Sequence, residues 1–170
     1  MKLKLCLIIG LITCAGMATA ETKIERLGIS GDWVAYQVDE SGSKICYMAA
    51  RPTSSKGKYT RRGDVFLTVT HRPADKAYDV VSFAAGYTYL KGEKPTITID
   101  KNKSISMFSK SEGAWVEKSE TDQKLVSQMR KGGQVVIKGR SFRKTQTTDT
   151  FSLKGFSKAY QMINKACGRD

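Results

Sequence analysis

The first 20 residues have the pattern of a cleavable export signal, which decides both the compartment and the cysteine content of the folded protein. Lys2 and Lys4 form a basic start, an apolar run follows over residues 5–12, and a small-x-small cleavage motif ends at Ala20. The apolar run is too short to cross a bilayer as a helix. We therefore expect residues 1–20 to be removed and the protein to work in the periplasm or outside the cell.

The expected mature chain, residues 21–170, has the length of a single domain. A chain of this size buries enough surface to fold without a metal or a dense disulfide framework. Its sequence contains no apolar run near the ~18 residues of a membrane-spanning helix, so we expect no transmembrane segment. Lipidation at Cys14 is the alternative to cleavage after Ala20, but Thr13 is bulkier than the small residue that precedes a lipidated cysteine.

Removal of the signal also removes Cys6 and Cys14 and leaves one pair of cysteines, Cys46 and Cys167. An oxidising compartment favours disulfides, and an even number of cysteines in an exported chain usually pairs. In the chain-entropy description, closing so long a loop contributes about 4–5 kcal/mol to stability. We predict a Cys46–Cys167 disulfide, with two buried free thiols as the alternative.

Clustered positive charge is the second strong feature. The chain carries a net charge of +13, and removal of Lys2 and Lys4 lowers it to +11. Lys101 and Lys103 form one cluster, and the residues that we expect to bind an anionic partner form two others: Lys56, Lys58, Arg61 and Arg62, and Lys138, Arg140, Arg143 and Lys144.

Such clusters attract anionic surfaces over about a Debye length. For an exported protein we expect the partner to be a lipid, lipopolysaccharide or glycan of the envelope or of a host surface, or an envelope protein, rather than nucleic acid. The alternative interpretation is a solvated surface that keeps the protein soluble.

Short segments of alternating polarity dominate the rest of the chain, and they are typical of strands. A hairpin is predicted from residues 32–38 and 44–49, followed by a basic loop over 51–63. Further strands are predicted at 65–70, 78–84, 96–99, 105–108, 114–116, 134–138 and 150–153, with 146–150 as a polar edge strand.

Two segments have helical periodicity. One helix is predicted between Ser119 and Gly132, and a second is predicted to be capped by Ser157 and to end at Gly168. About nine strands and two helices predict a mainly β fold, an antiparallel β-sandwich or open barrel with one mid-chain and one C-terminal short α-helix.

The sequence offers little for catalysis. His71 is the single histidine, and no Gly-x-Ser-x-Gly motif supplies a nucleophilic serine for it. One histidine and two distant cysteines lack the spacing of a zinc site, so we expect no metal and no cofactor. We expect a protein that is not an enzyme, and a His71-dependent hydrolase is an alternative.

Two further patterns allow either a structural or a functional interpretation. Residues 62–64 spell Arg-Gly-Asp, which some animal adhesion receptors read, but we interpret it as the end of a loop followed by the start of a strand. Six aromatic residues form either a binding surface or core and rim packing, and we expect the packing role: Trp33, Tyr36, Tyr47, Tyr87, Tyr89 and Trp115.

Four blocks of the chain resemble the invasion-associated locus B family. They are Trp33-Val34-Ala35-Tyr36, Ile45-Cys46-Tyr47-Met48, Thr70-His71-Arg72-Pro73, and the closing block Ser152-Leu153-Lys154-Gly155-Phe156 with its helix and Cys167. The resemblance implies a small exported bacterial protein of the cell envelope. It also implies that Trp33 and Cys46 hold the first hairpin and that residues 156–167 pack as the closing helix.

One position departs from the family pattern. Many members carry a cysteine four residues after the first tryptophan, where this chain has Gln37. A bridge within the first hairpin is therefore impossible here. Together these features predict an exported, non-enzymatic envelope or periplasmic protein that binds an anionic surface or partner, with a secreted adhesion or invasion factor as the alternative.

Overall fold

The computed structural model describes residues 22–169, which form twelve strands in two antiparallel sheets. The predicted export signal lies outside the described residues. In spatial order, the seven-stranded sheet contains β1 (Lys23–Ser30), β2 (Trp33–Glu40), β3 (Ser43–Ala50), β5 (Phe66–Arg72), β6 (Ala77–Ala84), β10 (Gly113–Trp115) and β9 (Phe108–Lys110). The five-stranded sheet contains β4 (Ser54–Gly57), β12 (Gln146–Ser152), β11 (Gln134–Arg140), β7 (Thr96–Ile99) and β8 (Ile105–Ser106).

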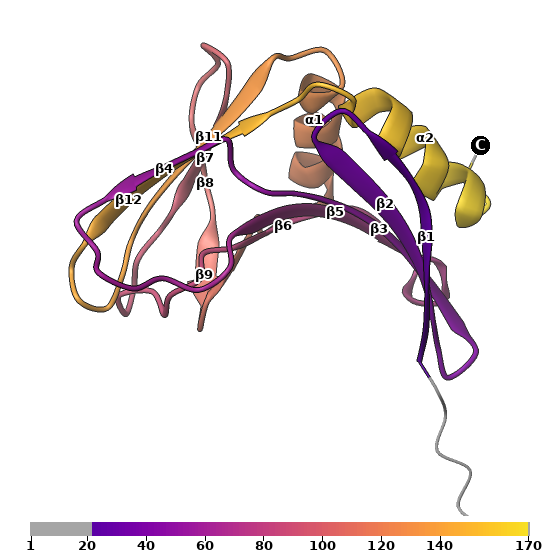
Figure 1. Cartoon of the computed structure of the whole chain (residues 1–170), viewed down its shortest axis with the longest axis horizontal. Coiled ribbons are helices and arrows are strands. Elements are labelled where there is room, and N and C mark those ends of the chain that lie inside the picture. Colours follow the sequence, from indigo (N-terminus) through magenta and orange to yellow (C-terminus); the bar gives the residue numbers. More distant parts are fainter. Residues whose placement is uncertain (1–21, 170) are drawn as a thin grey trace, which may run out of the picture.

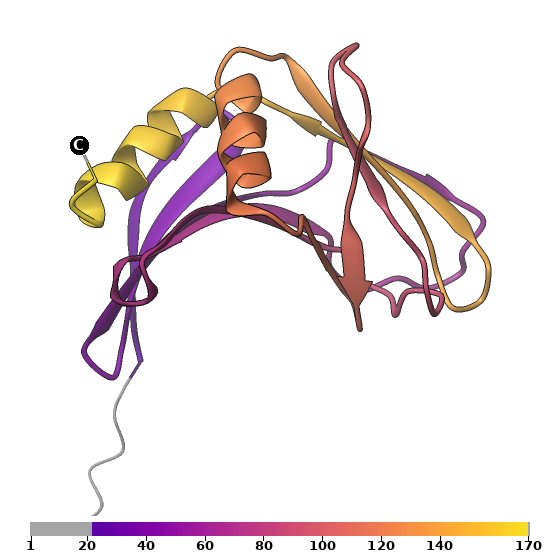
Figure 2. The ribbon, with the colours of Figure 1, turned by 180° about the vertical axis from the view of Figure 1, so that it is seen from behind.

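The seven-stranded sheet is arched, and both α-helices lie on one side of the arch (Figures 1 and 2). Helix α1 (Ser119–Met129) contacts β6 and β7, and helix α2 (Phe156–Ala166) contacts β1, β2 and β3. A short 3-10 helix, η1 (Pro73–Asp75), joins β5 to β6. The predicted mainly β fold with one mid-chain and one C-terminal helix is confirmed, and it is consistent with a β-sandwich.

Alternation of buried and accessible residues along strands such as β5, β7 and β12 creates the core between the two sheets and the helices. In β5, Leu67 and Val69 are buried, whereas Phe66 and Thr68 are partly exposed on the other face of the sheet. Side chains of successive residues in a strand point to opposite faces, so one face can be apolar and the other accessible.

The closing block of the sequence fastens α2 to the first hairpin. Trp33 is buried, donates its indole N–H to the carbonyl of Ser152 at 3.0 Å, and packs edge-on against Phe156 at 4.9 Å. Gly155 has a φ of 87°, and a Cβ there would lie 2.0 Å from the carbonyl oxygen of Ser30. Only glycine allows this contact between backbones, which confirms the packing role that the resemblance implied for Trp33 and the closing helix.

Several predicted boundaries were wrong, and the reasons are physical. Strand β1 is exposed over most of its length and β4 is short and polar, so neither shows the alternation that marks a half-buried strand. The predicted strand 105–108 is divided at buried Met107, where the chain passes from one sheet to the other. Residues 146–150 were predicted to be an edge strand, but they are part of β12, which lies between β4 and β11 because the undetected strand β4 covers that edge.

The predicted cap of the last helix was also wrong. Gly155 is the N-cap residue, and Ser157 lies within α2, where its hydroxyl donates to the carbonyl of Arg130 at the end of α1. This side chain therefore links the two helices instead of beginning one of them.

Candidate functional site

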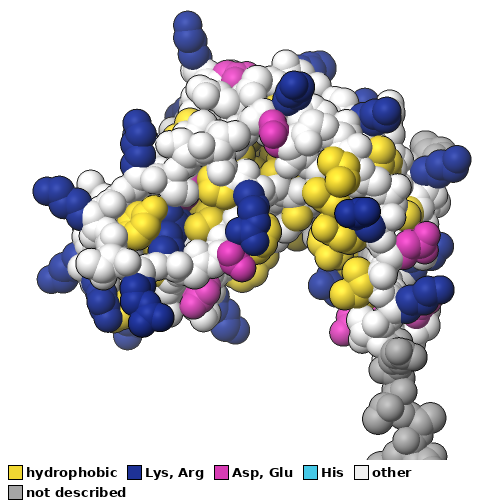
Figure 3. All heavy atoms as spheres, in the orientation of Figure 1, with side chains coloured by type: hydrophobic (Ala, Val, Ile, Leu, Met, Phe, Trp, Pro, Cys, Tyr) yellow, Lys and Arg dark blue, Asp and Glu magenta, His cyan; other side chains and the backbone are white. Residues whose placement is uncertain are grey.

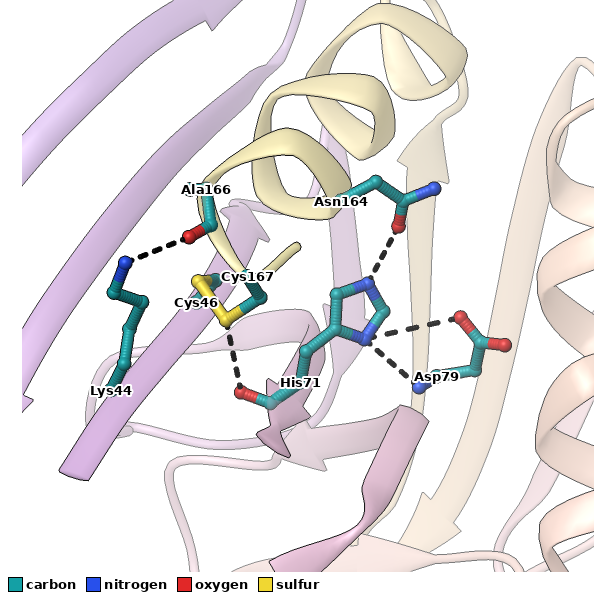
Figure 4. The surroundings of a disulfide bond; sticks show 7 residues. All are labelled: Lys44, Cys46, His71, Asp79, Asn164, Ala166 and Cys167. Atoms are coloured by element: carbon teal, nitrogen blue, oxygen red, sulfur yellow. Dashed lines mark hydrogen bonds and ion pairs between the residues drawn. A yellow bond between two sulfur atoms is a disulfide. The ribbon is translucent and has the colours of Figure 1, made fainter. Parts of the chain in front are cut away.

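Cys46 and Cys167 form the predicted disulfide, which joins β3 to the end of α2 (Figure 4). The two Cα atoms are 6.0 Å apart, although 121 positions separate them in the chain. Gln37 lies directly opposite Cys46 in the β2–β3 ladder. Lys44 donates its Nζ to the carbonyl of Ala166 at 3.1 Å and so satisfies one of the last carbonyls of α2.

His71 lies beside this disulfide and is buried, with both ring nitrogens engaged (Figure 4). Its Nδ1 accepts the backbone N–H of Asp79 at 3.1 Å, so Nε2 carries the proton and donates to Oδ1 of Asn164 at 2.9 Å. Burial lowers the pKa of His71, which keeps the ring neutral at pH 7. The ring holds α2 against β5 and β6.

Asp79 is the centre of the adjoining polar cluster. Its carboxylate accepts the hydroxyl of Tyr160 and pairs with Arg169, each at 2.6 Å. The residue has a φ of 60°, in a left-handed region that aspartate tolerates better than most residues. This cluster ties the C-terminal end of the chain to β6, and its groups are occupied by one another.

A basic pocket lies at the other end of the molecule, between the long β4–β5 loop and the hairpin that joins β11 to β12. It is open and has a volume of about 560 Å³. It brings together residues from two of the basic clusters identified in the sequence. The lining residues are 58–63, 86–88, Glu112, 141–143, Thr145 and Thr147.

Arg62 fastens the β4–β5 loop across this pocket and is not a free cation. Its guanidinium makes two hydrogen bonds of 2.8 Å to the carboxylate of Asp149, and its Nε donates to the carbonyl of Ala85 at 2.7 Å. The side chains of Arg62 and Asp149 are 5% and 0% exposed. Burial alone would lower the pKa of Arg62, but the hydrogen bonds and charge of Asp149 outweigh it and raise that pKa.

This pairing corrects the prediction that Arg62 contributes to an anion-binding surface, because the guanidinium is buried and already bonded to Asp149 and Ala85. It also explains the Arg-Gly-Asp tripeptide. Asp64 pairs with Arg51 at 2.9 Å, and Gly63 donates its N–H to Gly86 at 2.8 Å. The tripeptide is thus a loop anchor, with its arginine buried.

The other predicted cations are at least partly accessible, and they surround the same end of the five-stranded sheet. Figure 3 shows Lys and Arg side chains gathered over the end that carries β4 and β12. Lys58, Arg61 and Arg143 line the basic pocket. The outer face of the sheet and the hairpin add four more, which line two adjoining hollows or flank them: Lys56, Lys138, Arg140 and Lys144.

The register explains this gathering. Lys56 lies opposite Thr148, which in turn lies opposite Lys138, so cations distant in sequence share one face of the sheet. Lys101 and Lys103 lie beyond the opposite end of β7, past the pairing of Ile99 with Val135.

Aromatic residues accompany the cations of the basic pocket, and two of them, Phe142 and Tyr59, were not predicted from the sequence. Phe142 is 55% exposed and Tyr59 is 37% exposed. The Arg62 guanidinium lies over the rings of Tyr59 and Tyr87, and Arg143 lies over Phe142. The sequence contained this signal, because each of the two clusters that line the pocket includes one aromatic residue: Tyr59 follows Lys58, and Phe142 precedes Arg143.

The remaining aromatics of the predicted set are divided between core and surface. Trp33 and Tyr89 are buried, whereas Tyr36 and Tyr47 are stacked on the outer face of the seven-stranded sheet. That face is hollowed under the arch, with apolar side chains visible along it (Figure 3). This hollow has a volume of about 690 Å³, and small residues such as Ala49 and Ser82 line it together with Tyr36, Tyr47 and Phe66.

Comparison with known proteins adds the family. The family model described as Invasion associated locus B (IalB) protein matches residues 33–164, from the start of β2 into α2. Searches of curated proteins and of solved structures found no match. Within residues 22–169, neither helix is long and apolar enough to cross a membrane, and no group of His, Cys, Asp and Glu is arranged to hold a metal ion. The length of the match shows that the chain belongs to the invasion associated locus B family, a bacterial family of exported proteins.

Proposed function

We propose that this protein is a non-enzymatic, exported envelope or periplasmic protein that binds an anionic partner through the basic pocket. The observation that carries the proposal is the assembly of Lys58, Arg61 and Arg143 around one open pocket. These residues come from two segments that the fold brings together through the pairing of β4 with β12. A converging set of like charges raises the local concentration of counter-ions and attracts an anionic surface.

The non-enzymatic part of the proposal is supported by the state of the reactive side chains. His71 is buried with both nitrogens bonded, so it lacks the accessible nitrogen that a general base requires. Cys46 and Cys167 are joined to each other, which withdraws both sulfurs from nucleophilic chemistry.

The predicted export signal and the family support a location outside the cytoplasm. A secreted adhesion or invasion factor remains the second candidate, because a sulfated host surface would suit the same cations. Proteolysis of intact cells separates the two. A protein in the periplasm is protected from added protease, whereas a surface factor is cleaved.

Retention on immobilised heparin tests the binding proposal. Arg61→Gln combined with Arg143→Gln removes two charges from the pocket, and each cation near an anionic surface contributes about 1 kcal/mol, so we expect affinity to fall about tenfold or more. Lys101→Gln combined with Lys103→Gln removes the same charge from the opposite end of the sheet. The two double variants are equal in net charge, so equal losses would show that total charge and not the pocket is responsible.

A further inference from the structure

The composition of the basic pocket indicates more than attraction to negative charge. A site that bound only phosphate or sulfate would need cations and backbone N–H groups. This pocket also presents the rings of Phe142 and Tyr59, together with the hydroxyl-bearing residues Thr60 and Thr88 and the carboxylate of Glu112. Its ligand should therefore have an apolar face and hydroxyl groups as well as anionic groups.

Sugars that carry sulfate or phosphate have these three properties in one molecule. One face of a pyranose ring is made of C–H groups and packs on an aromatic ring, while its hydroxyls exchange hydrogen bonds with threonine and carboxylate oxygens. Arginine matches the geometry of sulfate and phosphate oxygens better than lysine does, and the pocket offers Arg61 and Arg143.

The shape of the region favours a chain of sugars. The basic pocket shares Lys58 and Thr145 with a second hollow, which shares Gln146 with a third hollow of about 400 Å³. The three hollows follow the β11–β12 hairpin from the mouth of the pocket to the outer face of the sheet. Their combined lining carries cations along its whole length, including Lys144 and Lys138.

A bilayer surface fits less well. A lipid surface is contacted by protruding residues, whereas Arg61 and Arg143 border a hollow whose volume lies in the range of roughly 300–1,000 Å³ that is typical of small-ligand sites. A continuous anionic plane would also be repelled by Glu112, which lines the pocket. The hydroxyl of a sugar whose charges are spaced along the chain would instead donate a hydrogen bond to this carboxylate.

The pocket is held in shape before any ligand arrives. Arg62 and Asp149 anchor one wall, and Phe142 donates its N–H to the carbonyl of Thr88 at 2.8 Å to anchor the other. A rigid site loses less freedom on binding, which favours affinity.

We infer that the basic pocket recognises an oligosaccharide bearing sulfate or phosphate groups, with sugar faces on Phe142 and Tyr59 and the anionic groups on Arg61 and Arg143. This inference rests on the proposed function and specifies its ligand. The anionic sugar has two sources, a sulfated host glycan or a phosphorylated lipopolysaccharide core.

Calorimetric titration of the mature protein tests the inference with size-defined heparin oligosaccharides and with delipidated, phosphorylated core oligosaccharide. The preferred probe identifies the source. Phe142→Ala leaves the net charge of the protein unchanged. It should lower the affinity for the preferred oligosaccharide roughly three- to tenfold, which is the scale of one aromatic contact. Ile29→Ala is the matched control, because Ile29 is 58% exposed and lies on edge strand β1.

The outcomes distinguish this inference from the proposed function. Loss of binding in the Arg61→Gln/Arg143→Gln variant with no effect of Phe142→Ala would overturn the sugar inference and keep the anionic site. Stronger binding to phosphatidylglycerol vesicles than to either oligosaccharide, unaffected by Phe142→Ala, would make the ligand a membrane. Unchanged binding in the arginine variant would overturn both.

Discussion

Arg62 and Asp149 meet through two parallel hydrogen bonds of 2.8 Å, although 87 positions separate them in the chain. The pair connects the β4–β5 loop to β12, and Arg62 lines the basic pocket. Ser55 adds a third contact by donating its hydroxyl to Asp149 at 2.7 Å. One of the cations predicted to bind a partner thus has a structural role at the site instead.

Replacing Arg62 with alanine should lower the free energy of unfolding by about 3–5 kcal/mol, because Asp149 would remain buried without its partner. Urea denaturation measures the change. The matched variant Arg62→Met combined with Asp149→Leu removes both charges and should recover most of the stability, since a buried pair replaced by apolar residues is often nearly neutral. Equal losses in the single and double variants would contradict this account.

Arg62 also illustrates what could not be predicted from the sequence. Position 62 lies in a run of cations that all look alike locally, and its burial depends on an aspartate from a distant strand. Strands β1 and β4 escaped detection for a related reason, because their stability comes from pairing with β2 and β12 and not from their own alternation. The sequence identified what was local, namely the hairpin, the two helices and the cationic clusters.

The disulfide was predictable because the expected signal cleavage left a single possible pair. The basic pocket was predictable only in part. Its charges could be counted in the sequence. Tyr59 and Phe142 line the same pocket only because the β4–β5 loop and the β11–β12 hairpin lie side by side. That arrangement follows from the β4–β12 ladder, which the polar sequence of β4 did not reveal.

Loss of the Cys46–Cys167 disulfide should destabilise the protein by about 5 kcal/mol, because it closes a long loop in the unfolded chain. Denaturation of a Cys46→Ser/Cys167→Ser variant measures this loss, and hydrogen exchange should show faster opening at the C-terminal end of α2. In the unmodified protein, reduction should add the mass of two hydrogens. Two alkylatable thiols in the unreduced, unfolded protein would refute the bridge.

The contribution of Asp122 to the free energy of unfolding should decrease as pH rises from about 4 to about 6. Burial raises the pKa of this carboxyl to about 6, although its Oδ1 accepts the N–H of Val81 at 2.8 Å. The unfolded carboxyl loses its proton near pH 4, so the folded state binds more protons within this window. The stabilisation by the protonated Asp122 carboxyl is therefore fully present below pH 4 and is lost as pH rises through 6.

Asp122→Asn isolates this effect, because the amide oxygen still accepts the Val81 N–H but does not ionise. The difference in unfolding free energy between the two proteins should change by about 2–3 kcal/mol between pH 4 and pH 7. His71 contributes with the opposite sign, since burial lowers its pKa, but its contribution is common to both proteins and cancels. Parallel stability curves would show that Asp122 has an ordinary pKa.

Lys144→Gly should increase the stability of the protein and at the same time weaken its retention on heparin. Lys144 lies in the β11–β12 hairpin with a φ of 63°, a left-handed conformation that costs a side-chain-bearing residue about 1 kcal/mol relative to glycine. Glycine relieves this strain and removes one cation beside the basic pocket. Lys76→Gly is the matched control, because Lys76 has a φ of 53° in the turn between β5 and β6. It should gain similar stability and keep its retention on heparin, whereas equal retention losses in both variants would argue against a localised site.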